Sequence, residues 1–120
     1  MMWIIANAEA RYMFSKVTVK LSLCNNYEGG AWYATVDNDV QHEHVIELDF
    51  GIETVGELVA ALMSEAKSYD TIAIRCKRTA ERHAAIATSV AFSEMAANIT
   101  RQSINIGVMD LQSWLISQGF

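Results

Sequence analysis

Residues 71–99 read TIAIRCKRTAERHAAIATSVAFSEMAANI, and this stretch joins a run of alternating side chains to the longest apolar helix that the chain can form. In its first part Ile72, Ile74 and Cys76 share one face, a pattern that predicts a strand buried on that side. From Thr79 onward, small and apolar residues fall on nearly all sides, which is typical of a helix that packs against more than one neighbour. We expect this strand-to-helix junction to organise the fold.

Composition indicates a small globular chain. It has 120 residues, of which 52% are hydrophobic and 19% charged, and such a composition excludes intrinsic disorder. No apolar run is long enough to span a bilayer, and MMWII at the start is too short for a secretory signal, so we expect a cytoplasmic protein without a membrane partner. In that compartment Cys24 and Cys76 should be free thiols. We predict a single α+β domain over residues 1–120, with residues 1–12 either a dispensable extension or an edge strand.

Three segments upstream of residue 54 alternate between apolar and polar side chains, which predicts half-buried strands at 16–24, 31–36 and 43–50. Turn residues separate them at 25–30, which includes two glycines, and at 37–39. Consecutive strands joined by short turns favour an antiparallel meander.

A change of period at Thr54 predicts a helix, because apolar residues then recur every three or four positions as far as Ala66. Thr54 and Glu57 have the spacing of a capping box. Ser68 to Asp70 are interpreted as the connection to the strand at 71–76.

After the apolar helix, residues 103–109 alternate again and predict a further strand, and Asp110 has the position of a cap for a last short helix. The expected order is therefore β-β-β-α-β-α-β-α, with an extra N-terminal strand over residues 2–6 as an open alternative. The predicted fold class is α+β, with a mixed, mostly antiparallel sheet and two or three helices on one face.

Charge is divided along the chain. Between Leu21 and Ala66 there are nine acidic residues and no Lys or Arg, whereas residues 67–101 carry six basic residues and three acidic ones. The net charge is -5. Such a division can steer charged partners, and it is equally typical of a solvated surface.

A cluster of basic residues marks the predicted junction. Arg75, Lys77, Arg78 and Arg82, with His83 beside them, lie where the second long helix should begin. The first amide groups of a helix favour an anion, and arginine binds phosphate or carboxylate with two parallel hydrogen bonds. The alternative is that these bases pair with the acidic segment, within the chain or across an interface.

Two aromatic residues, Tyr27 and Trp32, flank the glycine pair of the first turn and are candidates for stacking on a planar ligand. The alternative is a hairpin with ordinary core aromatics, which the turn composition favours.

Other chemistry has weaker signals. His42 and His44 have the H-x-H spacing of a metal-binding pair, but a third ligand is not evident and a pair of sheet-edge histidines explains them as well. No nucleophile elbow, phosphate-binding loop or dinucleotide motif is present in the sequence. We therefore predict no metal, no cofactor and no catalytic residues, and favour a binding protein over an enzyme.

Two functional hypotheses follow. The first is a non-enzymatic protein that captures a phosphorylated, nucleotide-like or otherwise anionic small ligand at Arg75, Lys77, Arg78, Arg82 and His83, with Tyr27 and Trp32 as stacking residues. The second is an inhibitor of the immunity or phage anti-defence kind, whose acidic residues block a basic nuclease or another nucleic-acid-binding protein. The alanine-rich helix also favours a homo-oligomer. The negative net charge disfavours direct binding of nucleic acid.

Overall fold

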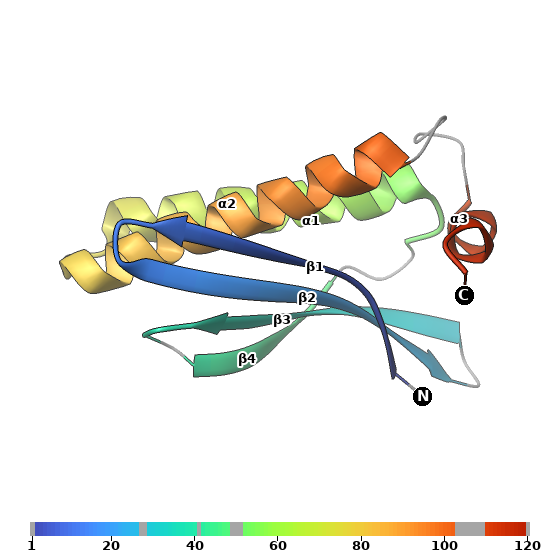
Figure 1. Ribbon diagram of the computed structural model, residues 1–120, viewed down its shortest axis with the longest axis horizontal. Helices are drawn as coiled ribbons and strands as arrows, with labels where there is room; N and C mark the ends of the chain where they lie inside the picture. Colours follow the sequence, from blue (N-terminus) through green and yellow to red (C-terminus); the bar gives the residue numbers. More distant parts are fainter. Residues whose placement is uncertain (1, 27–28, 41, 49–51, 103–109, 120) are drawn as a thin grey trace.

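The computed structural model describes residues 2–26, 29–40, 42–48, 52–102 and 110–119. Within them the chain forms four strands followed by three helices, which is an α+β fold (Figure 1). The strands make one antiparallel sheet in the order β1-β2-β3-β4, with bounds Met2–Tyr12, Ser15–Asn26, Gly29–Asn38 and His42–Glu47.

The three strands predicted as a meander are confirmed as β2, β3 and β4. In β2 the alternating side chains of Val17, Val19 and Leu21 are fully buried, and Val19 and Leu21 pair with Val36 and Ala34 of β3. These positions form the inner face of the sheet, which is the face toward the helices. Lys16 and Lys20 are exposed, as expected for the opposite face.

The N-terminal segment is also a strand, longer than the five residues expected there. β1 pairs with β2 from Met2 to Tyr12, with a bulge between Ile4 and Ala6, so the strand does not end at residue 6. A two-residue turn, Met13 and Phe14, joins β1 to β2. β1 therefore lies at one edge of the sheet and β4 at the other.

The strand predicted at residues 71–76 is wrong, because α1 runs without interruption over Val55–Arg75. The apolar stripe of α1 continues through the buried side chains of Tyr69 and Ala73, while Ile74 is 85% exposed. The hydroxyl of Thr71 donates to the carbonyl oxygen of Lys67, which accommodates a β-branched polar residue within the helix. The described sheet is consequently antiparallel throughout, not mixed, and residues 68–70 are helical.

The other helical predictions are confirmed. α2 spans Thr79–Gln102 and α3 spans Leu111–Ser117. Thr54 caps α1 by accepting a hydrogen bond from the backbone N–H of Glu57 at 3.1 Å, and Asp110 caps α3 by accepting from that of Ser113 at 2.8 Å. The strand predicted at residues 103–109 lies outside the described residues.

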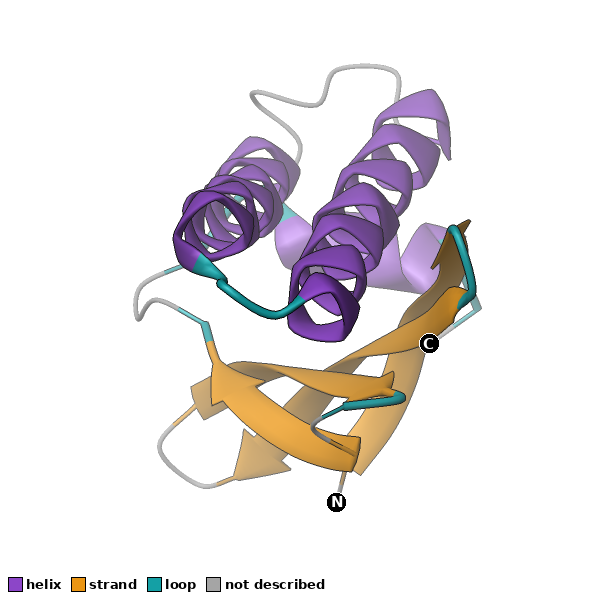
Figure 2. Cartoon of the chain, turned by 90° about the vertical axis from the view of Figure 1, so that its left-hand side faces the viewer, coloured by secondary structure: helices purple, strands orange, loops and turns teal. Residues whose placement is uncertain are grey.

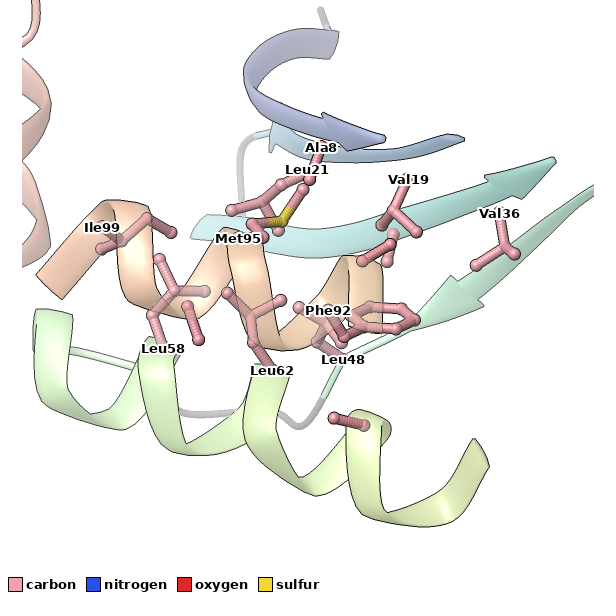
Figure 3. Close-up of a cluster of buried hydrophobic side chains, with 14 of the residues drawn as sticks. Ala8, Val19, Leu21, Val36, Leu48, Leu58, Leu62, Phe92, Met95 and Ile99 are labelled. Carbon is pink, nitrogen blue, oxygen red and sulfur yellow. The ribbon is translucent and has the colours of Figure 1, made fainter. Parts of the chain in front are cut away.

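The helices form a second layer on the inner face of the sheet (Figure 2). α2 packs against β1 and β2, whereas α1 packs chiefly against α2. Side chains from α1, α2 and the strands meet in one core, which Figure 3 shows around Leu62, Phe92 and Met95. Because α2 has neighbours on two sides within one chain, its apolar composition does not require a second subunit.

None of the helices in the described residues has the length and hydrophobicity to cross a membrane.

Candidate functional site

A cleft of about 770 Å³ opens at the end of the molecule where the β3–β4 turn meets the turn between α1 and α2. Its volume falls within the roughly 300–1,000 Å³ that small-molecule sites occupy. The wall combines apolar side chains with polar ones that can form hydrogen bonds. The lining residues are Asn38, Val40, His44, Tyr69, Ile72, Cys76, Glu81, Ala84 and Ala85.

The cleft arises from the way the helices cover the sheet. α2 lies on β1 and β2, and α1 lies beside α2 without packing its backbone closely on β3 or β4. Small residues, Ala84 and Ala85, occupy the side of α2 that faces the opening. The half of the inner face that belongs to β3 and β4 is therefore covered less tightly at this end.

One hydrogen bond bridges the cleft from sheet to helix. Nε2 of His44, on β4, lies 3.1 Å from the hydroxyl oxygen of Tyr69, on α1. Nδ1 of the same ring lies 3.5 Å from the carbonyl oxygen of His42, which accepts only if Nδ1 carries the proton. In that tautomer the Tyr69 hydroxyl donates to Nε2, so the orientation of both polar groups is fixed.

Tyr69 is held in place by its surroundings. Its ring stacks on that of Phe92 with a centroid distance of 5.8 Å, and only 8% of the residue is exposed. Burial, with a smaller contribution from the negative charge of Glu65, raises the pKa of the Tyr69 hydroxyl to about 12. The phenol is therefore neutral at physiological pH, and it serves as a hydrogen-bonding group and not as a proton acceptor.

Four basic residues predicted as a ligand site lie together at the turn beside the cleft. Arg75 ends α1, Lys77 and Arg78 form the turn, and Arg82 lies in the first turns of α2; all four are exposed. The guanidinium of Arg82 donates to the carbonyl oxygen of Cys76 at 3.0 Å. The cluster is thus real, but it lies at a helix-to-helix turn and not at the strand-to-helix junction that the sequence predicted.

This placement changes the electrostatic argument for the cluster. Arg75, Lys77 and Arg78 lie at the C-terminal end of α1, where unpaired carbonyl groups carry partial negative charge and attract cations. Arg82 satisfies one carbonyl of the same end directly. Arg82 therefore helps to cap α1, the other three lie where the helix dipole favours cations, and the start of α2 alone does not make an anion site.

The remaining predicted residues do not all join this cluster. His83 is half-buried and meets Tyr12 edge-on, with ring centroids 5.3 Å apart. Trp32 is buried in the core, six positions along β3 from Asn38, which corresponds to roughly 20 Å of strand. Tyr27 lies outside the described residues. Trp32 is accordingly not part of the cleft.

Metal chemistry has no support from the arrangement of side chains. His44 uses both ring nitrogens in the contacts described above, and His42 is exposed on the edge strand. Across the described ranges, no three His, Cys, Asp or Glu side chains gather as metal ligands would. Both cysteines are free thiols, Cys76 in the wall of the cleft and Cys24 on β2.

The sequence-based prediction missed the polar residues that line the cleft, above all Tyr69 and Glu81. Two signals were available. Tyr69 continues the three-and-four spacing of Leu58, Leu62 and Ala66, which predicts its side chain on the buried face of a longer helix. His44 is the polar member of an otherwise apolar strand face, a position that requires a hydrogen-bond partner.

Comparisons with known proteins found no family model, no curated protein and no solved structure that matches this chain.

Proposed function

We propose that the protein binds a small anionic, nucleotide-like ligand, with the body of the ligand in the cleft and its acidic group at the turn between α1 and α2. The observation that carries this proposal is the His44–Tyr69 hydrogen bond inside an opening of ligand size. Because the Tyr69 hydroxyl donates to His44, its oxygen keeps a lone pair that can accept a hydrogen bond from a molecule in the cleft, and a polar group of fixed orientation in a partly apolar cleft is typical of a site that orients a ligand.

Charge at the rim favours an anionic group. Arg75, Lys77 and Arg78 are exposed and lie within two positions of Cys76, which lines the cleft. The forked geometry of an exposed arginine side chain suits the oxygen atoms of phosphate. Glu81 also lines the cleft, so a ligand with a hydrogen-bond donor near its acidic group fits better than inorganic phosphate alone.

The proposal describes a binding protein without catalytic residues. The phenol of Tyr69 is neutral and hydrogen-bonded to His44, and such a fixed pair suits the binding of a ligand more than proton transfer. We keep the cytoplasm as the proposed compartment because both thiols are free.

Alkylation of the two cysteines tests the site directly. Occupancy of the cleft should slow modification of Cys76 and leave Cys24, on a different element, unaffected, so Cys24 is an internal control. The probes are adenosine monophosphate, adenosine and inorganic phosphate, and peptide mass spectrometry reads each thiol separately. We expect adenosine monophosphate to protect most strongly.

Substitutions separate the two parts of the site. Tyr69→Phe keeps the aromatic ring and removes the hydroxyl, and should weaken binding about tenfold, the value of one buried hydrogen bond. Arg78→Glu should weaken binding of the nucleotide but not of adenosine. Lys20→Glu, on the outer face of the sheet, is the matched control and should change neither. If none of the probes protects Cys76 at millimolar concentration, a nucleotide-like ligand is ruled out.

A second candidate function rests on the outer face of β3 and β4. Asp37 and Glu43 are paired directly across these strands, and both are exposed. Like charges at paired positions destabilise a sheet, and a basic partner bound there would relieve this repulsion. Val45, which is 60% exposed and lies on β4 with Glu43, adds apolar contact area. We propose, as the alternative to ligand binding, an inhibitor that covers the basic surface of a nuclease or another nucleic-acid-binding protein.

Inhibition assays on a panel of basic nucleases distinguish this alternative. Asp37→Lys and Glu43→Lys should abolish inhibition, and salt should weaken it, because the contact is electrostatic. The cleft substitution Tyr69→Phe should have no effect on inhibition. Loss of inhibition in Tyr69→Phe alone would contradict the use of this face.

A further inference from the structure

The edge of β1 that faces away from β2 is a surface separate from the cleft, whose lining includes no residue of β1. β1 is eleven residues long, and among the described strands only β2 pairs with it. Edge strands of this length present unpaired backbone N–H and C=O groups and usually carry devices that prevent pairing with another chain. β1 contains no proline, and its bulge lies near its start, between Ile4 and Ala6, which leaves the stretch from Asn7 to Tyr12 regular.

The hairpin identifies which residues direct their backbone groups outward. Tyr12 pairs with Ser15 across the two-residue turn, so this pair closes the hairpin with hydrogen bonds. Hydrogen-bonded and non-hydrogen-bonded pairs then alternate along an antiparallel ladder. Ala10 consequently bonds to β2, while the N–H and C=O groups of Glu9 and Arg11 point away from the sheet.

Glu9 and Arg11 carry opposite charges, so two copies of β1 related by a two-fold axis can place each charge opposite its counterpart. Glu9 and Arg11 are both exposed and lie two positions apart. Antiparallel pairing of two β1 strands about an axis at Ala10 places Glu9 of each copy opposite Arg11 of the other. We propose that a second copy of this chain binds along β1 in this register and joins the two sheets into one continuous antiparallel sheet.

The opposite edge provides the contrast. On β4 the charged side chains are Glu43 and Glu47, both exposed and both acidic. Self-pairing of β4 brings like charges together, which protects that edge against association. The same logic therefore favours contact at β1 and opposes it at β4.

The tip of the hairpin supplies apolar contacts in the same register. Phe14 is 99% exposed and Met13 is 62% exposed. Met13 also has φ 55, a left-handed conformation that is costly for a residue with a side chain. An axis at Ala10 brings this tip beside residues 4–7 of the second copy, where Ile4 is 55% exposed. Pairing covers large apolar side chains that a single chain leaves in water.

Charge exchange tests the contact. Glu9→Arg alone and Arg11→Glu alone should each lower the dimer population at least tenfold, whereas a mixture of these two variants should form a heterodimer, because every facing pair is then opposite in sign. The double variant Glu9→Arg, Arg11→Glu should dimerise like the wild type. Native mass spectrometry separates these species, and the charge reversal Asp37→Arg on β3 is the matched control.

A cysteine at the axis tests the register. In a background with Cys24→Ala and Cys76→Ala, Ala10→Cys should form a disulfide-linked dimer on mild oxidation, because non-hydrogen-bonded partners lie about 4.5 Å apart between Cα atoms. Ala8→Cys is the control, since its two copies lie about 13 Å apart along the strands in this register.

Two results would overturn the proposal. One is a wild-type chain that stays monomeric at about 100 µM, well above the concentration at which micromolar contacts form. The other is a dimer that survives both single charge reversals or that links through Ala8→Cys as readily as through Ala10→Cys. Unfolding curves of each variant exclude loss of fold, since Glu9 has one exposed salt bridge, to Lys16 at 3.5 Å, which contributes little.

Discussion

The inner face of the sheet differs between its two halves, and the difference locates the candidate site. Under α2, the β2 side chains Val17, Val19 and Leu21 are fully buried. Toward α1, the β4 residues His44 and Ile46 are only half-buried, and the contact to the helix is a hydrogen bond. Close packing of small and apolar side chains stabilises the first half, while the second half leaves space that a ligand can fill. This contrast implies a gradient of tolerance to substitution that measurements can test.

The largest contrast is between two aliphatic residues of α1. Leu62 is fully buried against α2, and Leu62→Ala should lower the free energy of unfolding by about 2–5 kcal/mol, because it leaves a cavity. Ile72, in the cleft wall and 46% exposed, loses less apolar burial, so Ile72→Ala should cost under about 1 kcal/mol. Chemical denaturation measures both. Equal losses would mean that the two halves are packed alike.

Adding volume sharpens the comparison on α2. Ala91 is fully buried, and Ala91→Leu should destabilise by about 1–3 kcal/mol because the core has no room for the larger side chain. Ala84 lines the cleft, so Ala84→Leu can direct its added atoms into open space and should be nearly neutral. The same substitution should weaken ligand binding. Strong destabilisation by Ala84→Leu would show that the cleft is closed in solution.

The buried hydroxyl of Tyr69, which bonds to His44 across the cleft, should affect how the free energy of unfolding depends on pH. Burial raises the pKa of Tyr69 to about 12 in the folded chain, while the unfolded value stays near 10. Because the folded state holds the proton more tightly, this contribution to stability is complete below pH 10 and is lost as the pH rises toward 12. Between pH 8 and pH 11 the loss should be about 1.4 kcal/mol.

Tyr69→Phe is the control for this measurement, since it cannot titrate. Denaturation at pH 8 and pH 11 should give a smaller decrease in the variant than in the wild type, by the same 1.4 kcal/mol or so. Other groups titrate equally in both proteins and cancel in the comparison. An identical pH dependence would show that Tyr69 is not buried against Phe92.

The sequence predicted the secondary structure of both halves, apart from the end of α1, but not the contacts between side chains that form the cleft. Alternation in β2 and the capping residues Thr54 and Asp110 are local signals, and the structure confirms the elements they predicted. The cleft depends on which side chains two distant segments bring together, such as His44 and Tyr69, and no local pattern contains that information. His44 also interrupts the apolar pattern of its strand face, so the pattern that identifies core residues does not identify this part of the cleft.

The basic turn was located correctly and its role was inferred from the wrong neighbour. Residues 71–76 were predicted as a strand, so the charges were assigned only to the start of the following helix. With α1 extending to Arg75, the same charges stabilise its C-terminal end. The proposed anion site therefore rests on the cleft, and not on the charge cluster alone.

The smallest expected effect concerns the segment whose secondary structure was predicted incorrectly. As part of a strand, Ile74 would lie on the buried face with Ile72, and a charge at that position would unfold the protein. In α1 its side chain is 85% exposed, so Ile74→Lys should change the free energy of unfolding by no more than about 0.5 kcal/mol.

The sign of that small effect is itself informative. Lys at position 74 lies one helical turn after Asp70 and near the C-terminal end of α1, so both the side-chain pair and the helix dipole favour it. Ile74→Glu reverses both contributions, and the difference between the two variants should be about 0.5–1 kcal/mol, decreasing with added salt. Thermal unfolding at low and high ionic strength measures it. A strand at this position would make both variants equally and severely destabilised, because burial of either charge is costly and neither would meet a helix dipole.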